Sequence, residues 1–266
     1  MNNLWLVVGL ALLPGLGNFA GGMVAEFVRT TPRLLNLALH AASGIVIGVV
    51  AIELMPEALD NLAGWWIAAS FAVGGAAYVG AEILIERVTS KDSRGGGSTM
   101  WMIYVAVAVD LTGDGLMIGS GSAVATSLAI VLAAGQVLAD FPEGYSVVAN
   151  LREKKVSRGR RIAVSFSFPV YCLGAALIAW LLLRNAPYVA LSFVAGLLTV
   201  AAVEDMLEEA HEAAGDTRSS TLAFVCGFAL FALVSAGLGS LIGKDGSQGE
   251  NTSEVYTLKD HMIHAS

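Results

Sequence analysis

Four acidic residues lie inside apolar stretches of this sequence, where charged side chains are rare. Asp110 and Asp114 are four residues apart in one stretch, and Asp140 and Glu143 are three apart in the next. On a helix, either spacing puts both side chains on one face. A carboxylate at bilayer depth costs about 2.5–3.5 kcal/mol, so these side chains should face a bundle interior or a water-filled path. Because neither stretch contains Lys or Arg near the acids, the carboxyl groups must share protons or hold a cation. We favour a cation.

Helix-breaking residues accompany both acid pairs. Phe141 to Gly144 reads Phe-Pro-Glu-Gly, and Thr112 to Gly115 reads Thr-Gly-Asp-Gly. Proline removes a backbone hydrogen bond, and interrupted helices at membrane depth expose carbonyl oxygens to ions. The alternative is a packing kink with glycines that allow close helix contact. We expect both helices to be interrupted at the site.

The composition indicates an integral membrane protein. Hydrophobic residues make up 56% of the 266 residues and charged residues only 14%, and the mean hydropathy is +0.69. A soluble domain carries about 25% charged residues. The net charge of −7 argues against a nucleic-acid partner. Cys172 and Cys226 lie in apolar runs without a CxxC spacing, so they indicate neither a disulfide framework nor a thiolate metal site.

Eight segments are long and apolar enough to cross a bilayer as helices. They are residues 4–28, 34–56, 64–86, 100–125, 127–150, 161–184, 187–210 and 219–243. Alternate connections hold 12 of the 15 Lys and Arg residues, all except Arg184, Lys244 and Lys259. Loops rich in Lys and Arg stay on the cytoplasmic side of a membrane. We therefore expect an all-α polytopic bundle in the cell (inner) membrane, with both termini on the outer side. Residues 1–244 would form the membrane domain, and the polar tail 245–266 would be disordered.

Further polar residues cluster at the ends of two other predicted spans. Glu53 and Glu57 close the second span, and a run of acids with one histidine closes the seventh: Glu204, Asp205, Glu208, Glu209, His211 and Glu212. His40, near the start of the second span, is interpreted as a packed or headgroup-facing residue and not as a ligand. The tail histidines, His261 and His264, give only a weak indication of metal collection.

Four motifs resemble those of the ZIP (Zrt-, Irt-like) metal transporters. Residues 139–144, Ala-Asp-Phe-Pro-Glu-Gly, resemble the fifth-helix H-E/D-x-P-E-G motif, and residues 110–115 resemble the fourth-helix H-N-x-P-E/D-G motif. Residues 53–58, Glu-Leu-Met-Pro-Glu-Ala, resemble the end of that family's second helix, and residues 204–211 resemble its seventh-helix stretch. The motifs occur in the family's order over the whole chain.

The resemblance implies a divalent metal transporter with a binuclear site between the fourth and fifth helices. Asp110, Asp140 and Glu143 would form the primary position, and Asp114 would belong to the neighbouring one. The resemblance also places Asp205, Glu209 and His211 at the cytoplasmic exit, with Glu204 beside them. Glu53 and Glu57 would lie toward the outer side or on the transport path.

The chain departs from the family pattern at several ligand positions. Asp110 and Ala139 stand where the family has histidines, and Leu111 stands where it has asparagine. A site of carboxylates, carbonyls and water suits harder ions such as Mn²⁺ or Mg²⁺, whereas imidazole favours Zn²⁺. The resemblance to the family favours zinc as the substrate. The oxygen donors, in contrast, also admit Mn²⁺, Fe²⁺, Co²⁺ or Cd²⁺. No further cofactor is expected.

The predicted activity is import of a divalent metal toward the cytoplasm by alternating access. No phosphate-binding GxxxxGK[ST] loop is present, so ATP is not expected to drive it. Uptake should fall in acid, because the carboxylates must be ionised to bind metal.

One alternative is a non-transporting metal sensor or scaffold. An intramembrane metalloenzyme is a remote alternative, because the sequence His-Glu-Ala-Ala-Gly at 211–215 lacks the second histidine of HExxH. Small residues at 74–77 allow a homodimer or internal packing.

Overall fold

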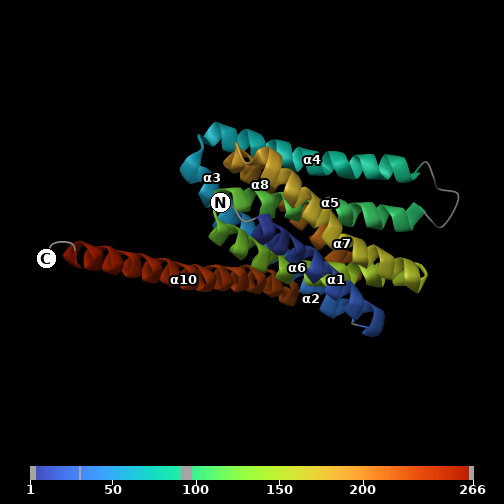
Figure 1. The fold of residues 1–266 in the computed structure, drawn as a ribbon. Helices are drawn as coiled ribbons and strands as arrows, with labels where there is room; N and C mark the ends of the chain where they lie inside the picture. The colour runs from blue at the N-terminus through green and yellow to red at the C-terminus, as the bar shows by residue number, and fades with distance from the viewer. Residues whose placement is uncertain (1–3, 30, 91–97, 264–266) are drawn as a thin grey trace.

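A computed structural model describes residues 4–29, 31–90 and 98–263. Every regular element in this part of the chain is helical (Figure 1). The elements are α1 (Leu4–Phe27), α2 (Pro32–Val49), η1 (Val50–Leu54), α3 (Met55–Asn61), α4 (Gly64–Ser90), α5 (Ser98–Val124), α6 (Thr126–Glu153), α7 (Arg158–Ile178), η2 (Ala179–Leu183), α8 (Pro187–Ala201), η3 (Ala202–Met206), α9 (Leu207–Ala213) and α10 (Arg218–Ile263). The three η elements are short π-helical turns that join the helices on either side.

Six helical stretches in the described residues are long and apolar enough to cross a membrane. They are Leu4–Phe27, Pro32–Asn61, Gly64–Ile85, Arg158–Leu183, Pro187–Ala213 and Arg218–Ile242. These stretches confirm the predicted all-helical membrane architecture at this level. The other two long helices, α5 and α6, hold the four acids, whose polarity lowers the hydropathy of both helices.

Glycines allow pairs of helices to pack closely. A Cβ atom on Gly21 of α1 would overlap the carbonyl oxygen of Phe141 on α6, and one on Gly144 of α6 would overlap that of Asn18. Similar close approaches join α2 to α10, α4 to α8 and α5 to α7. Small residues at helix contacts are typical of membrane bundles, where packing replaces the hydrophobic effect between helices. Gly74 packs against α8 of the same chain, while the homodimer stays a prediction.

The expectation of interrupted helices at the acid pairs is wrong. Both α5 and α6 are α-helical through their motifs, and Pro142 lies inside α6. A helix that ended here in an apolar environment would leave several backbone groups without hydrogen-bond partners. Continuing the helix past the proline therefore costs less free energy than ending it. Irregular backbone occurs instead in η1, which contains Glu53, and in η3, which contains Glu204 and Asp205. Such π-helical turns are common at functional sites.

The last helix is longer than the predicted span 219–243. It continues to Ile263 and extends beyond the rest of the bundle toward the C-terminus (Figure 1). Residues 264–266 lie outside the described residues. The division into a membrane domain, 1–244, and a separate tail, 245–266, stays a prediction.

Candidate cation site

The four predicted acids lie together inside the bundle. Asp110 and Asp114 come from α5, and Asp140 and Glu143 come from α6, which packs beside it. Asp114 and Asp140 are fully buried, and Asp110 and Glu143 are nearly so. Across the two helices, the carboxyl group of Asp110 lies near that of Glu143, and the carboxyl group of Asp114 lies near that of Asp140, so that the four charges interact. The helical spacing alone predicted each face correctly, and the packing of α5 on α6 brings the faces together.

Two buried amide side chains complete the cluster. Gln136 lies one turn before Asp140 on α6, and its Nε2 donates a hydrogen bond to Asp114 Oδ1. Asn18 comes from α1, and its Nδ2 donates to Glu143 Oε2 at 3.2 Å. Neither amide was predicted as a site residue. Gln136 had a signal in the sequence, because a polar residue four positions before Asp140 shares its helix face. For Asn18 the signal was only a polar residue in an apolar span.

Several oxygen atoms of this cluster have no hydrogen-bond donor. Among the described residues, no partner reaches Asp110 Oδ2, Asp114 Oδ2, either carboxylate oxygen of Asp140, Asn18 Oδ1 or Gln136 Oε1. Buried polar atoms are normally hydrogen-bonded, so each exception needs an explanation. No ion pair recorded for the described residues includes any of the four acids. A group of buried acceptors without donors is suited to hold a cation.

The two positions that depart most from the ZIP pattern offer no ligand. Leu111 and Ala139 are both fully buried. Leu111 packs with Val107, Val147 and other apolar side chains, and Ala139 belongs to the main apolar cluster. The donors of this site are therefore carboxylate and amide oxygens, without imidazole.

A cavity of about 340 Å³ leads from the buried cluster to the acidic end of the bundle. Asp110 and Glu143 form part of its wall, and the wall continues with residues that include Glu204, Asp205, Glu208, Glu209, Glu212 and Lys154. A second cavity of about 270 Å³ shares Asn150, Glu209 and Glu212 with the first. The acids at the end of the seventh predicted span therefore lie on a path to the buried carboxylates.

Other helices fix two of these acids. Glu209 Oε1 accepts hydrogen bonds from Ser146 Oγ at 2.6 Å and from Asn150 Nδ2 at 2.7 Å, both on α6. Asp205 accepts a hydrogen bond from the hydroxyl of Tyr78 on α4. Glu204 is exposed. Glu209 thus connects α9 directly to the helix that carries Glu143.

Glu53 and Glu57 do not join the buried cluster. Glu53 lies in η1 and Glu57 in α3, near the C-terminal end of the helical stretch that runs from α2 to α3. Asn36, near the N-terminal end of the same stretch, contacts α9. Glu53 accepts a hydrogen bond from Ser235 on α10, and the backbone carbonyl of Glu57 accepts one from Asn61. Both side chains are half-buried. Their role on the transport path stays a prediction.

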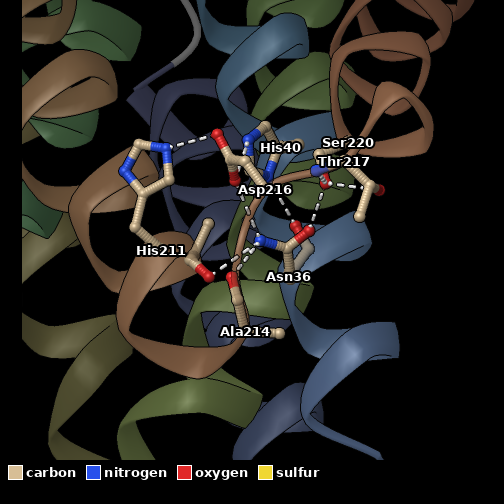
Figure 2. Close-up of polar contacts among 8 residues, drawn as sticks. Asn36, His40, His211, Ala214, Asp216, Thr217 and Ser220 are labelled. Atoms are coloured by element: carbon tan, nitrogen blue, oxygen red, sulfur yellow. Dashed lines mark hydrogen bonds and ion pairs between the residues drawn. The ribbon is translucent and has the colours of Figure 1, made fainter.

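His211 lies beside two residues that the sequence did not connect with it. Nε2 of His211 donates to Asp216 Oδ2 at 2.6 Å, and Nε2 of His40 lies 3.4 Å from Asp216 Oδ1 (Figure 2). His40 is buried, which favours the packed alternative over the headgroup-facing one, and its neighbours form a polar cluster. Partial desolvation raises the pKa of Asp216, but hydrogen bonds from His211 and Asn36 outweigh it and hold this pKa below its usual value.

Comparison with known proteins shows a distant similarity over part of the chain. No family profile matches the chain. A stretch of 99 residues, which is 34% of the chain, is 31% identical to the zinc transporter ZupT of Lysinibacillus sphaericus (strain C3-41). The match covers 36% of the length of that protein. A third of the chain is thus similar to part of a zinc transporter.

Proposed function

We propose that this chain carries a divalent metal cation across a membrane. The observation that carries the proposal is the group of buried oxygen atoms without donors on Asp110, Asp114, Asp140, Asn18 and Gln136. Four carboxylates so close together repel one another unless protons or a cation compensate their charge. A divalent cation supplies that compensation and uses the amide oxygens as further ligands.

The cavity supports transport and not binding alone. It connects Asp110 and Glu143 with acids on η3 and α9, so an ion released from the cluster meets further carboxylates on its way out. The cavity wall also includes Lys154, which lies in the strongly basic connection between α6 and α7. Basic loops stay cytoplasmic, so this end would be the cytoplasmic exit.

The proposal includes the membrane topology and the direction of transport. All eight long helical stretches would cross the inner membrane, with both termini outside, and the ion would move toward the cytoplasm. Rocking of one helix group against another would alternate access to the cluster. The membrane potential favours import by about 2.3 kcal/mol per charge per 100 mV.

The substrate follows from two arguments. The distant relative is a zinc transporter, and this favours Zn²⁺. Oxygen donors suit harder ions, so Mn²⁺ and Fe²⁺ should compete with Zn²⁺ better than they would at an imidazole site. We therefore propose Zn²⁺ as the main substrate, with poor discrimination against other divalent transition metals.

Uptake into proteoliposomes tests the proposal. The Asp140→Asn, Glu143→Gln double variant keeps the shape of the side chains and removes two charges, and we expect it to lose Zn²⁺ uptake. Asp60→Asn is a matched control, because Asp60 is an exposed acid on α3 outside the cluster. Unchanged uptake by the double variant would contradict the proposal.

The same preparation separates a carrier from the two alternatives. A sensor would bind metal at the four acids without moving it into vesicles, and an empty scaffold would do neither. The metal content of the purified protein, measured beside the uptake, distinguishes these cases. The relative that matches a third of the chain is named as a zinc transporter, which supports a carrier.

A further inference from the structure

The corner between α2, α9 and the start of α10 contains two histidines and one aspartate that could hold a metal. One ligand atom from each of His40, His211 and Asp216 lies within 4.8 Å of the other two. The residues come from α2, from α9 and from the turn that follows α9, so folding alone brings them together (Figure 2). None of the three lines the cavity described above. This cluster is therefore separate from the four buried acids.

The geometry of His40 leaves one nitrogen free for a ligand. Its Nδ1 lies 2.8 Å from the backbone carbonyl oxygen of Asn36. A carbonyl only accepts hydrogen bonds, so Nδ1 carries the proton and the lone pair of a neutral ring is on Nε2. That Nε2 points at Asp216 Oδ1, which also accepts hydrogen bonds. Two acceptors 3.4 Å apart need a proton or a cation between them.

Asn36 holds the aspartate in this position. Its Nδ2 donates to the carbonyl oxygens of Ala210 and Ala214 at 2.9 and 3.0 Å and to Asp216 Oδ1 at 3.3 Å. Its Oδ1 accepts a hydrogen bond from Ser220 at 2.7 Å. One buried side chain thus fixes the turn between α9 and α10 against α2 (Figure 2). Partners of this kind orient metal ligands, and a ring N–H on a carbonyl is the usual arrangement for a ligating histidine.

The burial of the ligands suits a site with an open position. The side chain of His40 is 6% exposed, whereas those of His211 and Asp216 are 52% and 47% exposed. An ion here would have protein on one side and water on the other, as in three-ligand sites that keep a water molecule. Metal–nitrogen distances of about 2.0–2.1 Å require the ligand atoms to move closer together than they lie now, and the exposed His211 ring would make this inward shift, with loss of its Nε2 proton.

We propose that His40, His211 and Asp216 form a second metal site, which takes a divalent transition cation such as Zn²⁺, Co²⁺ or Ni²⁺. Its two imidazoles and one carboxylate differ from the oxygen donors of the buried cluster, so the two sites differ in preference. Imidazole suits Zn²⁺ and its neighbours, whereas Mn²⁺ binds such ligands weakly. A bound ion would fasten α9, and with it Glu209, to α2. The site does not depend on the proposed transport.

Titration with Co²⁺ tests this proposal on the full chain in detergent. The background protein carries Asp140→Asn and Glu143→Gln, which neutralise two of the four acids of the buried cluster, and His261→Asn and His264→Asn, which remove the tail histidines. We expect this background to bind one Co²⁺ with the strong visible absorption of a tetrahedral site and to ignore Mn²⁺. Adding His211→Asn should weaken Co²⁺ binding by about 10–100-fold or more and abolish the absorption bands.

Two further variants keep the test decisive. His40→Asn should have the same effect as His211→Asn, and Asp60→Asn should have none. Because His211 is exposed, its variant should fold, and circular dichroism checks this. If the background does not fold, the wild-type chain is compared with its His211→Asn variant. We expect the variant to bind one equivalent of Co²⁺ fewer than the wild type. Equal binding with and without His211 would show that the cluster is an ion pair alone and would overturn the proposal.

Uptake measurements keep the two proposals apart. Loss of transport in Asp140→Asn, Glu143→Gln concerns only the buried acids. Co²⁺ binding in that same background concerns only the histidine site. Either proposal can therefore fail while the other stands.

Discussion

Asn18 on α1 and Glu143 on α6 are joined by a hydrogen bond of 3.2 Å, although 125 residues separate them in the chain. Asn18 is fully buried, and its Oδ1 has no donor among the described residues. The amide therefore orients Glu143 with its nitrogen and leaves its oxygen available as a metal ligand. A third helix thus contributes to the site between α5 and α6.

Replacing Asn18 should weaken metal binding without removing a charge. We expect Asn18→Ala to lower the affinity of the cluster for Zn²⁺ by about 10–100-fold, because partners that orient metal ligands have effects of this size. Isothermal titration of the purified protein measures the change. Asn61→Ala is the control, since Asn61 is exposed and its side chain donates to the backbone carbonyl of Glu57, outside the cluster. An unchanged affinity would mean that Asn18 has only a packing role.

Adding a methyl group at Gly144 should separate α1 from α6. A Cβ there would overlap the backbone oxygen of Asn18, whereas a Cβ on Gly174 of α7 meets no atom within 4 Å. Overpacking of this kind costs about 1–3 kcal/mol. We expect Gly144→Ala to lower the thermal midpoint and also the affinity for metal, because Asn18 moves away from Glu143.

The control for that prediction is Gly174→Ala, which should leave both the midpoint and the affinity near those of the wild type. If the two alanine variants behave alike, the close contact of α1 with α6 does not position the site.

The ion pair between Glu26 and Arg161 should stabilise the bundle strongly only when both partners are present. Arg161 Nε and Nη2 donate to the two oxygens of Glu26 at 2.5 and 2.8 Å, and the side chains are 11% and 2% exposed. Removing one partner of a fully buried pair typically costs about 3–5 kcal/mol, because the other charge stays buried. We expect a smaller loss here, because Arg158 Nε lies 3.6 Å from Glu26 Oε2 and still compensates part of its charge. We expect Arg161→Met to lower the free energy of unfolding. The Glu26→Gln, Arg161→Met double variant should recover most of that loss. Unfolding in mixed micelles gives both values, and two single variants as stable as the wild type would refute this account.

Glu209 should affect the rate of transport more than the equilibrium binding. It lies in the walls of both cavities and is bonded to Ser146 and Asn150, outside the cluster of four acids. We expect Glu209→Gln to slow Zn²⁺ uptake at saturating metal while the affinity of the purified protein changes less than for Asn18→Ala. Initial rates in proteoliposomes and titration in detergent provide the comparison. Equal losses in both measurements would place Glu209 among the ligands.

Metal affinity at the buried cluster should decrease as the pH falls. The carboxyl groups must lose their protons to coordinate a cation, so binding releases protons and acid opposes it. Each proton released makes the affinity change by about tenfold per pH unit, with the weaker binding on the acid side. Titrations across a pH series measure this slope. A slope of zero would mean that no carboxyl group changes protonation when the metal binds.

The helices and the acid-bearing faces could be predicted from the sequence. Apolar length predicted the helical segments, because a helix satisfies the hydrogen bonds of its backbone within one apolar segment. Spacings of three and four residues predicted that Asp110 and Asp114, and likewise Asp140 and Glu143, share a face. The prediction of interrupted helices at Pro142 and Gly113 was wrong, since local helix-breaking residues do not outweigh the cost of unpaired backbone.

What the sequence by itself determined is therefore which residues form helices and which acids share a helix face, because both depend on spacing along the chain. Only the tertiary structure decided which faces meet. The approach of α1 to α6 brings Asn18 to Glu143, and the packing of α9 and its turn against α2 brings His40 to Asp216. These contacts join residues more than a hundred positions apart, and they depend on where small residues let helices pack closely. No local pattern around His40 indicated a partner in the turn after α9.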